Sequence, residues 1–518
     1  MSGWILLPVL LPVLAGACML GSSAVSKWKG RPQPDAASLR RLHLAVCGVL
    51  SVSAVLALLA AWSGEHEVTL FYLMKDIPVY FRIDEIGRLF VTVISIVWVA
   101  VGIYSCVYMR HEGEEKRFFG FYLIVYSVLI ALSFAGNLVT MYLFYELMTL
   151  ASMPMVLHNG SREAIMAALK YLFYSMCGAY MGLFGIYFLY QYTDTLTFTA
   201  GGTLDMTRAA GHEGVLLVAV FVMLLGFGAK AGMFPLHAWL PTAHPVAPSP
   251  ASAVFSGVIV KCGVLAAIRT VYYVVGPDFL RGTWVQTVWM TLALLTVFMG
   301  SMLAYREPVL KKRLAYSTVS QISYILFGLA LMTPTAMSGA LLHVVFHAFI
   351  KAALFLTAGI FIFGCGKTRA DELTGIGKQM PGTLWCYTFA SLALIGIPPA
   401  SGFISKWYLA QGALEAPVGA FRWIGPVVLL VSALLTAGYL LPVVMRGFFP
   451  GASWRGMSAE DTAVRTERDG GNCVAQTSGD APAGMLVPLA VLAALTLLLG
   501  VFPNPLISFV SKIAEAVM

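Results

Sequence analysis

Long apolar segments occupy most of this chain, and they limit its fold more than any other feature. A membrane-spanning helix needs about 20 mostly apolar residues, and the sequence divides into fourteen such stretches. Hydrophobic residues make up 59% of the chain and charged residues only 11%, whereas soluble proteins carry about 25% charged residues. The sequence therefore predicts an all-α polytopic membrane protein. The predicted spans are residues 4–22, 39–62, 88–109, 117–135, 137–157, 164–191, 214–236, 250–275, 284–304, 310–332, 338–364, 383–408, 425–446 and 483–502.

The positively charged loop residues predict the orientation of these spans. With the N-terminus outside, most loop lysines and arginines fall on the cytoplasmic side, as the positive-inside rule requires. We therefore expect both termini outside and a location in the inner membrane of a bacterium or archaeon. The one long loop, residues 447–482, is rich in Gly, Ser, Asp and Arg and lacks hydrophobic periodicity. It is typical of a flexible cytoplasmic connection.

Charge and cysteine patterns exclude several classes of function. The net charge of +8 is spread over loops and spans rather than gathered in a basic patch with aromatic neighbours, so we expect no nucleic-acid partner. The eight cysteines form no CxxC pair and no Cys/His ligand spacing, so we expect no metal and no other cofactor. No Gly-rich phosphate loop is present, which argues against an ATP-driven pump.

Several charged side chains lie inside the predicted spans. Each costs roughly 3 kcal/mol near the bilayer centre on insertion scales. Such residues usually mark a path for ions or protons. Lys170 is close to the end of its span and could instead extend toward the membrane surface. The six residues are Glu146, Lys170, Lys230, Lys261, Lys351 and Lys406.

Two spans contain residues that break helices. The seventh contains Pro235, and the twelfth contains Pro398, Pro399 and Gly402. The two spans are five apart and so run in opposite directions, which predicts an inverted repeat of two five-helix halves, spans 4–8 and 9–13. The predicted units are residues 1–109, 110–275, 276–446 and 447–518. Two ordinary proline kinks are the alternative.

Histidines also lie near these spans. His343, His347 and Lys351 are spaced i, i+4, i+8 in span eleven and share one helix face. Three titratable groups in one row are typical of a proton relay; metal binding and hydrogen bonding between helices are the alternatives. His237 and His244 follow the break in span seven, where they would either feed protons from the cytoplasm or cap the broken helix.

Glu146 in span five is expected to pair with Lys230, because spans five and seven run parallel in the same half. The pair either gates proton release from Lys230 toward the other lysines or is a static ion pair. Buried ion pairs seldom stabilise a protein more than apolar residues would, so the gating role is favoured.

These residues carry a resemblance to a known family. The chain resembles the antiporter-like subunits shared by Mrp-type cation/proton antiporters, respiratory complex I and membrane-bound hydrogenases. The match covers spans four to thirteen in order, through the segments FYELMTLASMPMVLH, PLHAWLPTAHPVAPSPASAVFSGVIVK, LAYSTVSQISYILFGLA, HVVFHAFIKAALFLTAG and GIPPASGFISKW. The resemblance implies fourteen helices, inverted repeats and a central polar axis. It also implies roles by position: Glu146 and Lys230 as a pair, Lys261 as the connecting lysine, His343, His347 and Lys351 as a relay, and Lys406 as the terminal lysine near the outer exit.

Among these subunits the chain looks most like the D-type subunit of Mrp antiporters. It stops after span fourteen, where the largest subunits continue, and it has Lys406 where one complex I paralogue has glutamate. This predicts a proton- or Na⁺/H⁺-translocating subunit without a redox centre, surrounded by homologous and small membrane subunits. A pumping subunit of an NADH:quinone oxidoreductase or membrane-bound hydrogenase is the alternative. A solute symporter would need an uncharged polar pocket, which five lysines along an axis argue against.

Overall fold

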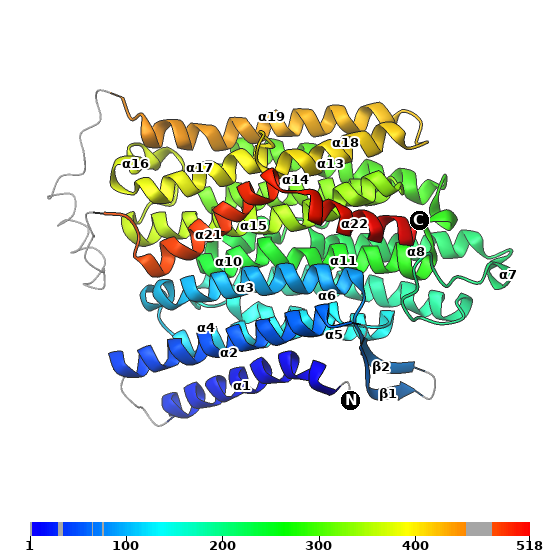
Figure 1. The fold of residues 1–518 in the computed structure, drawn as a ribbon, viewed down its shortest axis with the longest axis horizontal. Coiled ribbons are helices and arrows are strands. Elements are labelled where there is room, and N and C mark those ends of the chain that lie inside the picture. The colour runs from blue at the N-terminus through cyan, green and yellow to red at the C-terminus, as the bar shows by residue number, and fades with distance from the viewer. Residues whose placement is uncertain (1–2, 29–34, 65, 75–76, 452–478) are drawn as a thin grey trace.

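The computed structural model describes the whole chain except residues 1–2, 29–34, 65, 75–76 and 452–478. The helices lie side by side with their long axes roughly parallel (Figure 1). The two chain termini lie at one end of this bundle, here called the terminus end, and residues 448–451 and 479–483 lie at the other, the loop end (Figure 1). Both termini therefore lie on the same side, as predicted; that this side faces outside stays a prediction.

Helices make up most of the described chain, and their bounds follow the predicted spans closely. They are α1 (Leu7–Trp28), α2 (Ala36–Trp62), α3 (Glu85–Glu112), α4 (Glu115–Ser133), α5 (Leu138–Val156), α6 (Arg162–Tyr192), α7 (Met206–Ala209), α8 (Glu213–Ala231), α9 (Leu240–Val246), α10 (Ser249–Val254), α11 (Val260–Thr270), α12 (Pro277–Leu280), α13 (Trp284–Arg306), α14 (Leu310–Ala330), α15 (Pro334–Cys365), α16 (Ile376–Gln379), α17 (Pro381–Ile395), α18 (Ser401–Glu415), α19 (Phe421–Phe448), α21 (Ala483–Val501) and α22 (Asn504–Val517).

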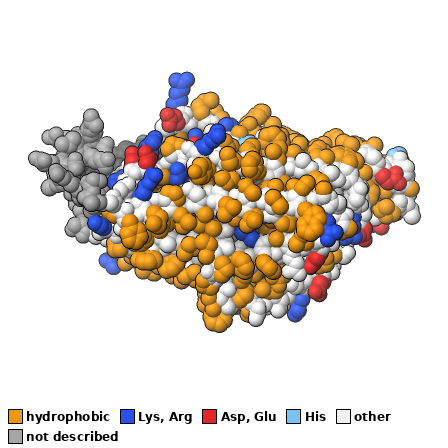
Figure 2. Space-filling view, turned by 90° about the horizontal axis from the view of Figure 1, so that it is seen from above, with side chains coloured by type: hydrophobic (Ala, Val, Ile, Leu, Met, Phe, Trp, Pro, Cys, Tyr) orange, Lys and Arg blue, Asp and Glu red, His pale blue; other side chains and the backbone are white. Residues whose placement is uncertain are grey.

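Twelve helices of the described chain are long and apolar enough to cross a membrane. The other two predicted spans, 310–332 and 383–408, correspond to α14 and to the consecutive short helices α17 and α18, so the count of fourteen stays a prediction. The surface agrees with a membrane location: charged side chains gather toward the two ends, and the band between them is largely apolar (Figure 2). The chain is thus a multi-pass membrane protein.

Side-chain caps explain why several helices begin where they do. Asp84, Asn137 and Ser161 accept hydrogen bonds from backbone N–H groups in the first turns of α3, α5 and α6, which satisfies donors that a helix start leaves open. Asn137 also resolves the tight turn between α4 and α5, because its side-chain amide donates to the Pro78 carbonyl at 2.7 Å.

The described chain is mostly helical, as predicted, and departs from this at residues 67–82, which form an antiparallel hairpin of β1 (Glu67–Met74) and β2 (Ile77–Arg82). The segment is rich in β-branched and aromatic residues, which favour strands. Tyr80 in β2 fastens the hairpin to the α4–α5 turn, since its hydroxyl donates to the Gly136 carbonyl at 2.9 Å. The hairpin lies at the terminus end near α1 (Figure 1).

Two further features were absent from the prediction. Helix α22 follows the last predicted span and packs against α15, burying Val510, Ile513, Ala514 and Val517. The expected flexible loop 447–482 lies mostly outside the described residues, but Asp480 at its end accepts hydrogen bonds from Gly382 N and Thr383 at the start of α17.

Both predicted helix breaks are present. The first lies between α8 and α9, and the second between α17 and α18. Each begins with a glycine in the left-handed region, Gly232 (φ 82°) and Gly396 (φ 91°), the common way to end a helix. A proline follows three residues later in each, Pro235 and Pro399. Helix α8 begins at the terminus end and α17 at the loop end (Figure 1), so the two broken segments run in opposite directions.

Candidate functional site

The Lys230 side chain lies in the last turn of α8 and is fully buried. Its Nζ donates to three hydroxyl groups: Thr149 Oγ1 at 3.0 Å, Tyr171 OH at 2.6 Å and Ser175 Oγ at 3.2 Å. It also lies 4.3 Å from the centroid of the Tyr171 ring, within the range of a cation–π contact. An ammonium has three protons to donate, so this cage satisfies all of them.

The expected direct ion pair between Glu146 and Lys230 is not formed. Within the described residues, no carboxylate oxygen lies within 4.0 Å of the Lys230 ammonium. Glu146 is half-buried on α5, three residues before Thr149, so the hydroxyl of Thr149 takes the place of the expected carboxylate. Any electrostatic coupling between Glu146 and Lys230 therefore acts over more than 4.0 Å, without a direct contact.

Lys261 lies in α11, directly after a π-helical turn at Phe255–Ile259 that the sequence did not predict. Its Nζ donates to the carbonyls of Ser256 at 3.2 Å and Gly257 at 2.6 Å within that turn. It also lies 3.0 Å from His347 Nδ1. Lys261 thus donates to backbone carbonyls within the π-helical turn and also contacts His347 on α15.

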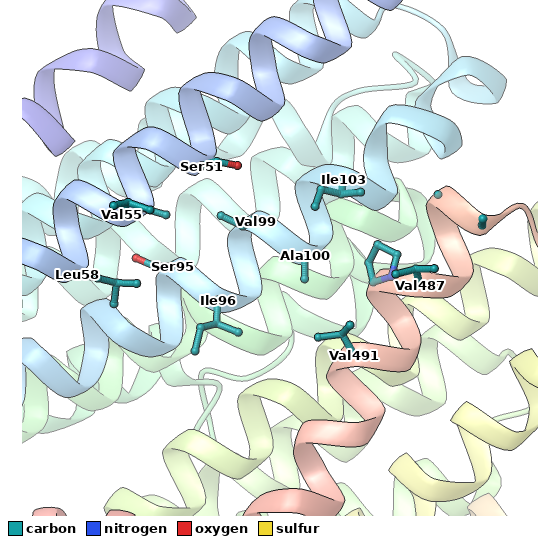
Figure 3. A pocket seen from close by; sticks show the side chains of 14 residues that line it. Ser51, Val55, Leu58, Ser95, Ile96, Val99, Ala100, Ile103, Val487 and Val491 are labelled. Atoms are coloured by element: carbon teal, nitrogen blue, oxygen red, sulfur yellow. The ribbon is translucent and has the colours of Figure 1, made fainter.

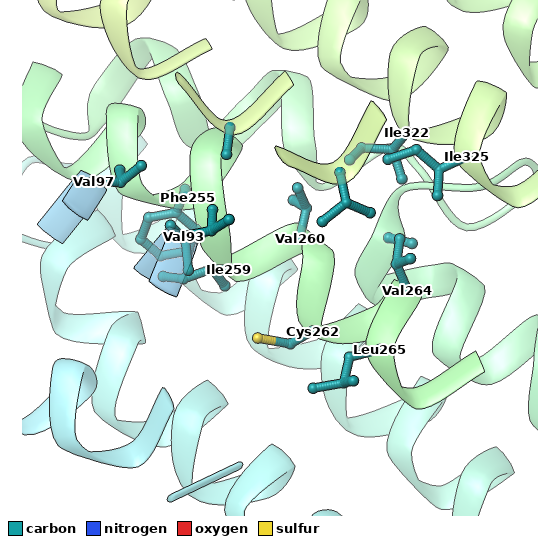
Figure 4. Packing of buried hydrophobic residues seen from close by; sticks show 14 of the residues in the cluster. Val93, Val97, Phe255, Ile259, Val260, Cys262, Val264, Leu265, Ile322 and Ile325 are labelled. Atoms are coloured by element: carbon teal, nitrogen blue, oxygen red, sulfur yellow. The ribbon is translucent and has the colours of Figure 1, made fainter. Parts of the chain in front are cut away.

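The surroundings of Lys261 are apolar. Its neighbours Val260 and Cys262 lie among buried side chains that include Phe255 and Ile322 (Figure 4). Helix α11 also approaches α8 closely, because a Cβ atom at Gly263 would lie 2.5 Å from the Phe227 carbonyl oxygen. This contact brings the Lys261 helix against the end of α8 that carries Lys230.

The two histidines of α15 continue the row of polar groups. His347 contacts Lys261, and its ring stacks on that of His343 with the centroids 5.8 Å apart. His343 Nδ1 then lies 2.9 Å from Ser405 Oγ, the residue before Lys406. Lys351, the third member of the predicted row, turns to α14, where its Nζ donates to Leu314 O at 3.0 Å and Ser317 Oγ at 2.7 Å.

Lys406 lies in α18 but its ammonium reaches back across the break. It donates to Leu394 O at 2.6 Å and Ile395 O at 2.9 Å, which are at the C-terminal end of α17. Lys230 also lies at the C-terminal end of a half-helix, α8. Helix C-termini carry partial negative charge that favours a cation. Each break thus places a lysine at the C-terminal end of a half-helix, although Lys230 is buried and precedes its break, whereas Lys406 is half-buried and follows it.

The remaining candidates differ in their surroundings. Lys170 and His237 are half-buried, whereas His244 is buried with its ring stacked on Phe355 at 4.6 Å. Lys311, at the start of the predicted span 310–332, is also buried, and its Nζ donates to the carbonyls of Pro245 and Ala247. The run Lys311-Lys312-Arg313 is typical of a loop, so the burial of Lys311 could not be predicted from the sequence.

At the terminus end, an ion pair that the sequence did not predict joins the buried Arg269 to the half-buried Asp84. Arg269 of α11 donates to both carboxylate oxygens of Asp84, one at 2.8 Å, and lies over the rings of Phe198 and Tyr273 at 4.5 and 4.8 Å. A bidentate pair of this kind fixes geometry, and this one ties the start of α3 to α11.

Several polar atoms near this row are buried without a hydrogen-bond partner among the described residues, and they belong to Tyr145, His244, Gln321, His343 and His347. Buried polar atoms are nearly always hydrogen-bonded.

No group of three His, Cys, Asp or Glu side chains among the described residues could hold a metal ion.

The fold and these groups define a class of protein: a polytopic membrane protein with several lysines and histidines inside its apolar core. The comparisons with known proteins agree. Residues 135–439 match the family model described as NADH:quinone oxidoreductase/Mrp antiporter, and residues 74–119 match that of the NADH-ubiquinone oxidoreductase (complex I) chain 5 N-terminus. The chain therefore belongs to the NADH:quinone oxidoreductase/Mrp antiporter family of membrane subunits, which confirms the resemblance seen in the sequence.

Individual relatives include both oxidoreductase subunits and antiporter subunits. The N-type NADH-quinone oxidoreductase subunit of Desulforudis audaxviator is 34% identical over 435 residues, covering 83% of this chain and 84% of the relative. The D-type Na⁺/H⁺ antiporter subunit of Alkalihalophilus pseudofirmus is 27% identical over 523 residues, covering 100% and 98%. A chain in the structure of the Mrp complex from Dietzia sp. DQ12-45-1b has the same fold, with a TM-score of 0.80 at 23% identity over 100% of this chain and 98% of that one.

Proposed function

We propose that this chain translocates protons as a subunit of a multisubunit Mrp-type antiporter. The observation that carries the proposal is the link between its two halves: Lys261 Nζ lies 3.0 Å from His347 Nδ1, and both side chains are fully buried. A contact of this length suits direct proton transfer. Full-length similarity to a D-type antiporter subunit supports the same assignment.

The path has an order in this proposal. Lys230 receives a proton in its hydroxyl cage, Lys261 passes it to His347, and His343 with Ser405 leads it to Lys406. Lys351 forms a side branch toward α14 and, through His244 and Lys311, toward the loop end. Glu146, half-buried near the Lys230 cage, acts on Lys230 through its charge rather than by contact. Lys170 and His237 are peripheral members.

Two faces of the bundle favour partner subunits. Pro235 in the first break, and Ile397 to Pro399 in the second, are exposed. Irregular backbone within the hydrocarbon region is tolerated only against protein or a wet cavity. The exposed breaks therefore support neighbouring membrane subunits there, in line with the antiporter relative. The proposed units remain 1–109, 110–275, 276–446 and 447–518, with the middle two as inverted repeats, and the proposed location is the inner membrane with both termini outside.

Substitution of Lys261 tests the relay directly. Lys261→Arg keeps a cation and donors for the two carbonyls, but arginine does not release its proton. We expect proton transport by the purified complex in vesicles to fall to background in this variant and in Lys261→Ala. The exposed Lys512→Ala serves as the control. Normal transport with Lys261→Arg would show that the position is structural.

Similarity to a quinone oxidoreductase subunit supports a second candidate, a pumping subunit that electron transfer in partner proteins would drive. A pH gradient alone drives the first type, whereas the second needs an electron donor and acceptor. Flux measurements with and without sodium, and with and without redox substrates, distinguish the two types and identify the ion as H⁺ or Na⁺.

A further inference from the structure

An apolar groove runs along the outer face of the bundle between α2, α3, α21 and α22. Its loop-end half is a cavity of about 620 Å³ lined by side chains such as Val55 of α2, Val99 of α3 and Val487 of α21. Figure 3 shows these side chains pointing into the space between the three helices. The cavity volume lies within the range of about 300–1,000 Å³ that is usual for small-ligand sites.

A second cavity of about 500 Å³ continues the groove toward the terminus end. Ile96 of α3 lines both cavities, so they adjoin. Helix α21 borders the groove along its 19 residues, about 28 Å at 1.5 Å per residue. The hydrocarbon core of a bilayer is about 30 Å thick, so each cavity occupies about one leaflet.

The loop end of the groove carries one exposed arginine, Arg110, next to His43, which in turn pairs with the Glu115 carboxylate. Ile96, Ile103 and Arg110 are spaced by seven residues along α3, so the exposed Arg110 lies on the groove face above the first cavity. Its guanidinium Nη2 is 3.4 Å from His43 Nδ1 on α2. Ala483 and Gly484, the first residues of α21, also line the cavity, and the start of a helix favours an anion.

We infer that the loop-end cavity binds an acyl chain of an anionic phospholipid whose phosphate lies beside Arg110. The apolar lining suits the acyl chain, the length of the cavity suits one leaflet, and Arg110 at the mouth suits the phosphate. An anionic headgroup near a membrane-surface arginine gains attraction that a zwitterionic one lacks. The site is separate from the row of buried lysines.

The charge at the mouth favours a lipid over an apolar partner helix. The exposed Arg110 on the groove face suits a phosphate, whereas an apolar helix would leave this guanidinium without an anionic partner. Phospholipid is also the solvent of this surface, and so is always present.

The groove also reaches the helix that carries the histidines. Val345 and Phe349 of α15 line the second cavity, two residues from His343 and His347 along the chain and so on the opposite face. Lipid in the groove thus supports the back of the relay helix. Its loss should loosen α15 without removing any proton-carrying group.

The test is lipid binding to the intact complex, purified through this chain and titrated with dioleoyl phosphatidylglycerol or dioleoyl phosphatidylcholine under native mass spectrometry. Val55→Trp fills the cavity. Val52→Trp is the matched control, because Val52 and Val55 are 53% and 55% exposed on the same helix and only Val55 lines the cavity. We expect Val55→Trp to weaken phosphatidylglycerol binding at least tenfold and Val52→Trp to leave it unchanged.

Arg110→Gln tests the headgroup, with the exposed Arg162→Gln as its control. We expect Arg110→Gln to lower the preference for phosphatidylglycerol over phosphatidylcholine by about fivefold, and Arg162→Gln to preserve it. Equal binding by the Val52→Trp and Val55→Trp complexes would overturn the proposal. So would loss of a partner subunit from the Val55→Trp complex with lipid binding unchanged, since it would show that a partner protein covers the groove.

Discussion

The hydroxyl cage of Lys230 yields a sharp prediction because two tyrosines flank the same ammonium in different ways. The Tyr171 hydroxyl lies 2.6 Å from Lys230 Nζ, whereas the Tyr145 hydroxyl is buried with no partner in the part of the chain that the structure describes. Both rings are near the ammonium, at 4.3 and 6.0 Å from centroid to Nζ. Replacing each tyrosine by phenylalanine keeps the ring and removes only the hydroxyl.

The expected effect follows from these contacts. A hydrogen bond to a charged group contributes about 1.5–3 kcal/mol, which corresponds to a factor of roughly 10 to 100 in an equilibrium. Tyr171→Phe should shift the protonation equilibrium of Lys230 toward the neutral amine by this factor. Where loading of Lys230 limits turnover, proton flux falls by up to the same factor. Tyr145→Phe removes no bond to the ammonium and should leave flux within about twofold.

The assay is acidification of vesicles that contain the purified complex and an entrapped pH-sensitive dye. Both variants must first assemble to the level of the unmodified complex. Equal losses in Tyr171→Phe and Tyr145→Phe would refute the reasoning, because they would show that packing of the rings, and not the hydrogen bond, matters. Unchanged flux in Tyr171→Phe would refute it as well.

Three further predictions concern the ion pair, the second break and a loop histidine. Arg269→Ala leaves the half-buried Asp84 carboxylate without its partner and should destabilise the protein by about 1–3 kcal/mol, seen as denaturant unfolding at a lower midpoint than in Arg162→Ala. Lys406→Arg should keep the end of α17 capped and preserve thermal stability, yet abolish proton flux; Lys406→Met should lose both, with about 1–3 kcal/mol for each carbonyl left unpaired. Burial lowers the pKa of His158, in the loop between α5 and α6, below its usual 6.5, so the unfolded chain binds this proton first; the melting temperature should fall as pH drops below about 6.5, and His158→Gln should reduce that slope.

The buried charges could be predicted from the sequence because each is costly in an apolar span. Lys230, Lys261 and Lys351 stand out against their neighbours for this reason, and all three are buried. The i, i+4 spacing of His343 and His347 fixes their common face, which the stacked rings show. The breaks could be predicted because proline and glycine act on the backbone locally.

Partners from distant segments could not be predicted. The cage around Lys230 comes from α5 and α6, and its hydroxyl groups look like ordinary span residues in the sequence. The expected carboxylate partner, Glu146, was the only acidic candidate visible, so the pattern favoured a charge where the structure uses hydroxyls. The hairpin was missed because residues 67–82 lie between two long apolar segments, whose signal outweighs six to eight residues of strand pattern.

The two contacts that connect Lys261 with the segment carrying Lys406 belong to a single helix, α15. His347 and His343 of α15 meet Lys261 on one side and Ser405 on the other. Because these residues share one rigid rod, a slide of one residue, about 1.5 Å, would open both contacts at the same moment. The connection between Lys261 and Ser405 is then made or broken in one step, so an axial movement of α15 would connect or disconnect Lys261 and Lys406.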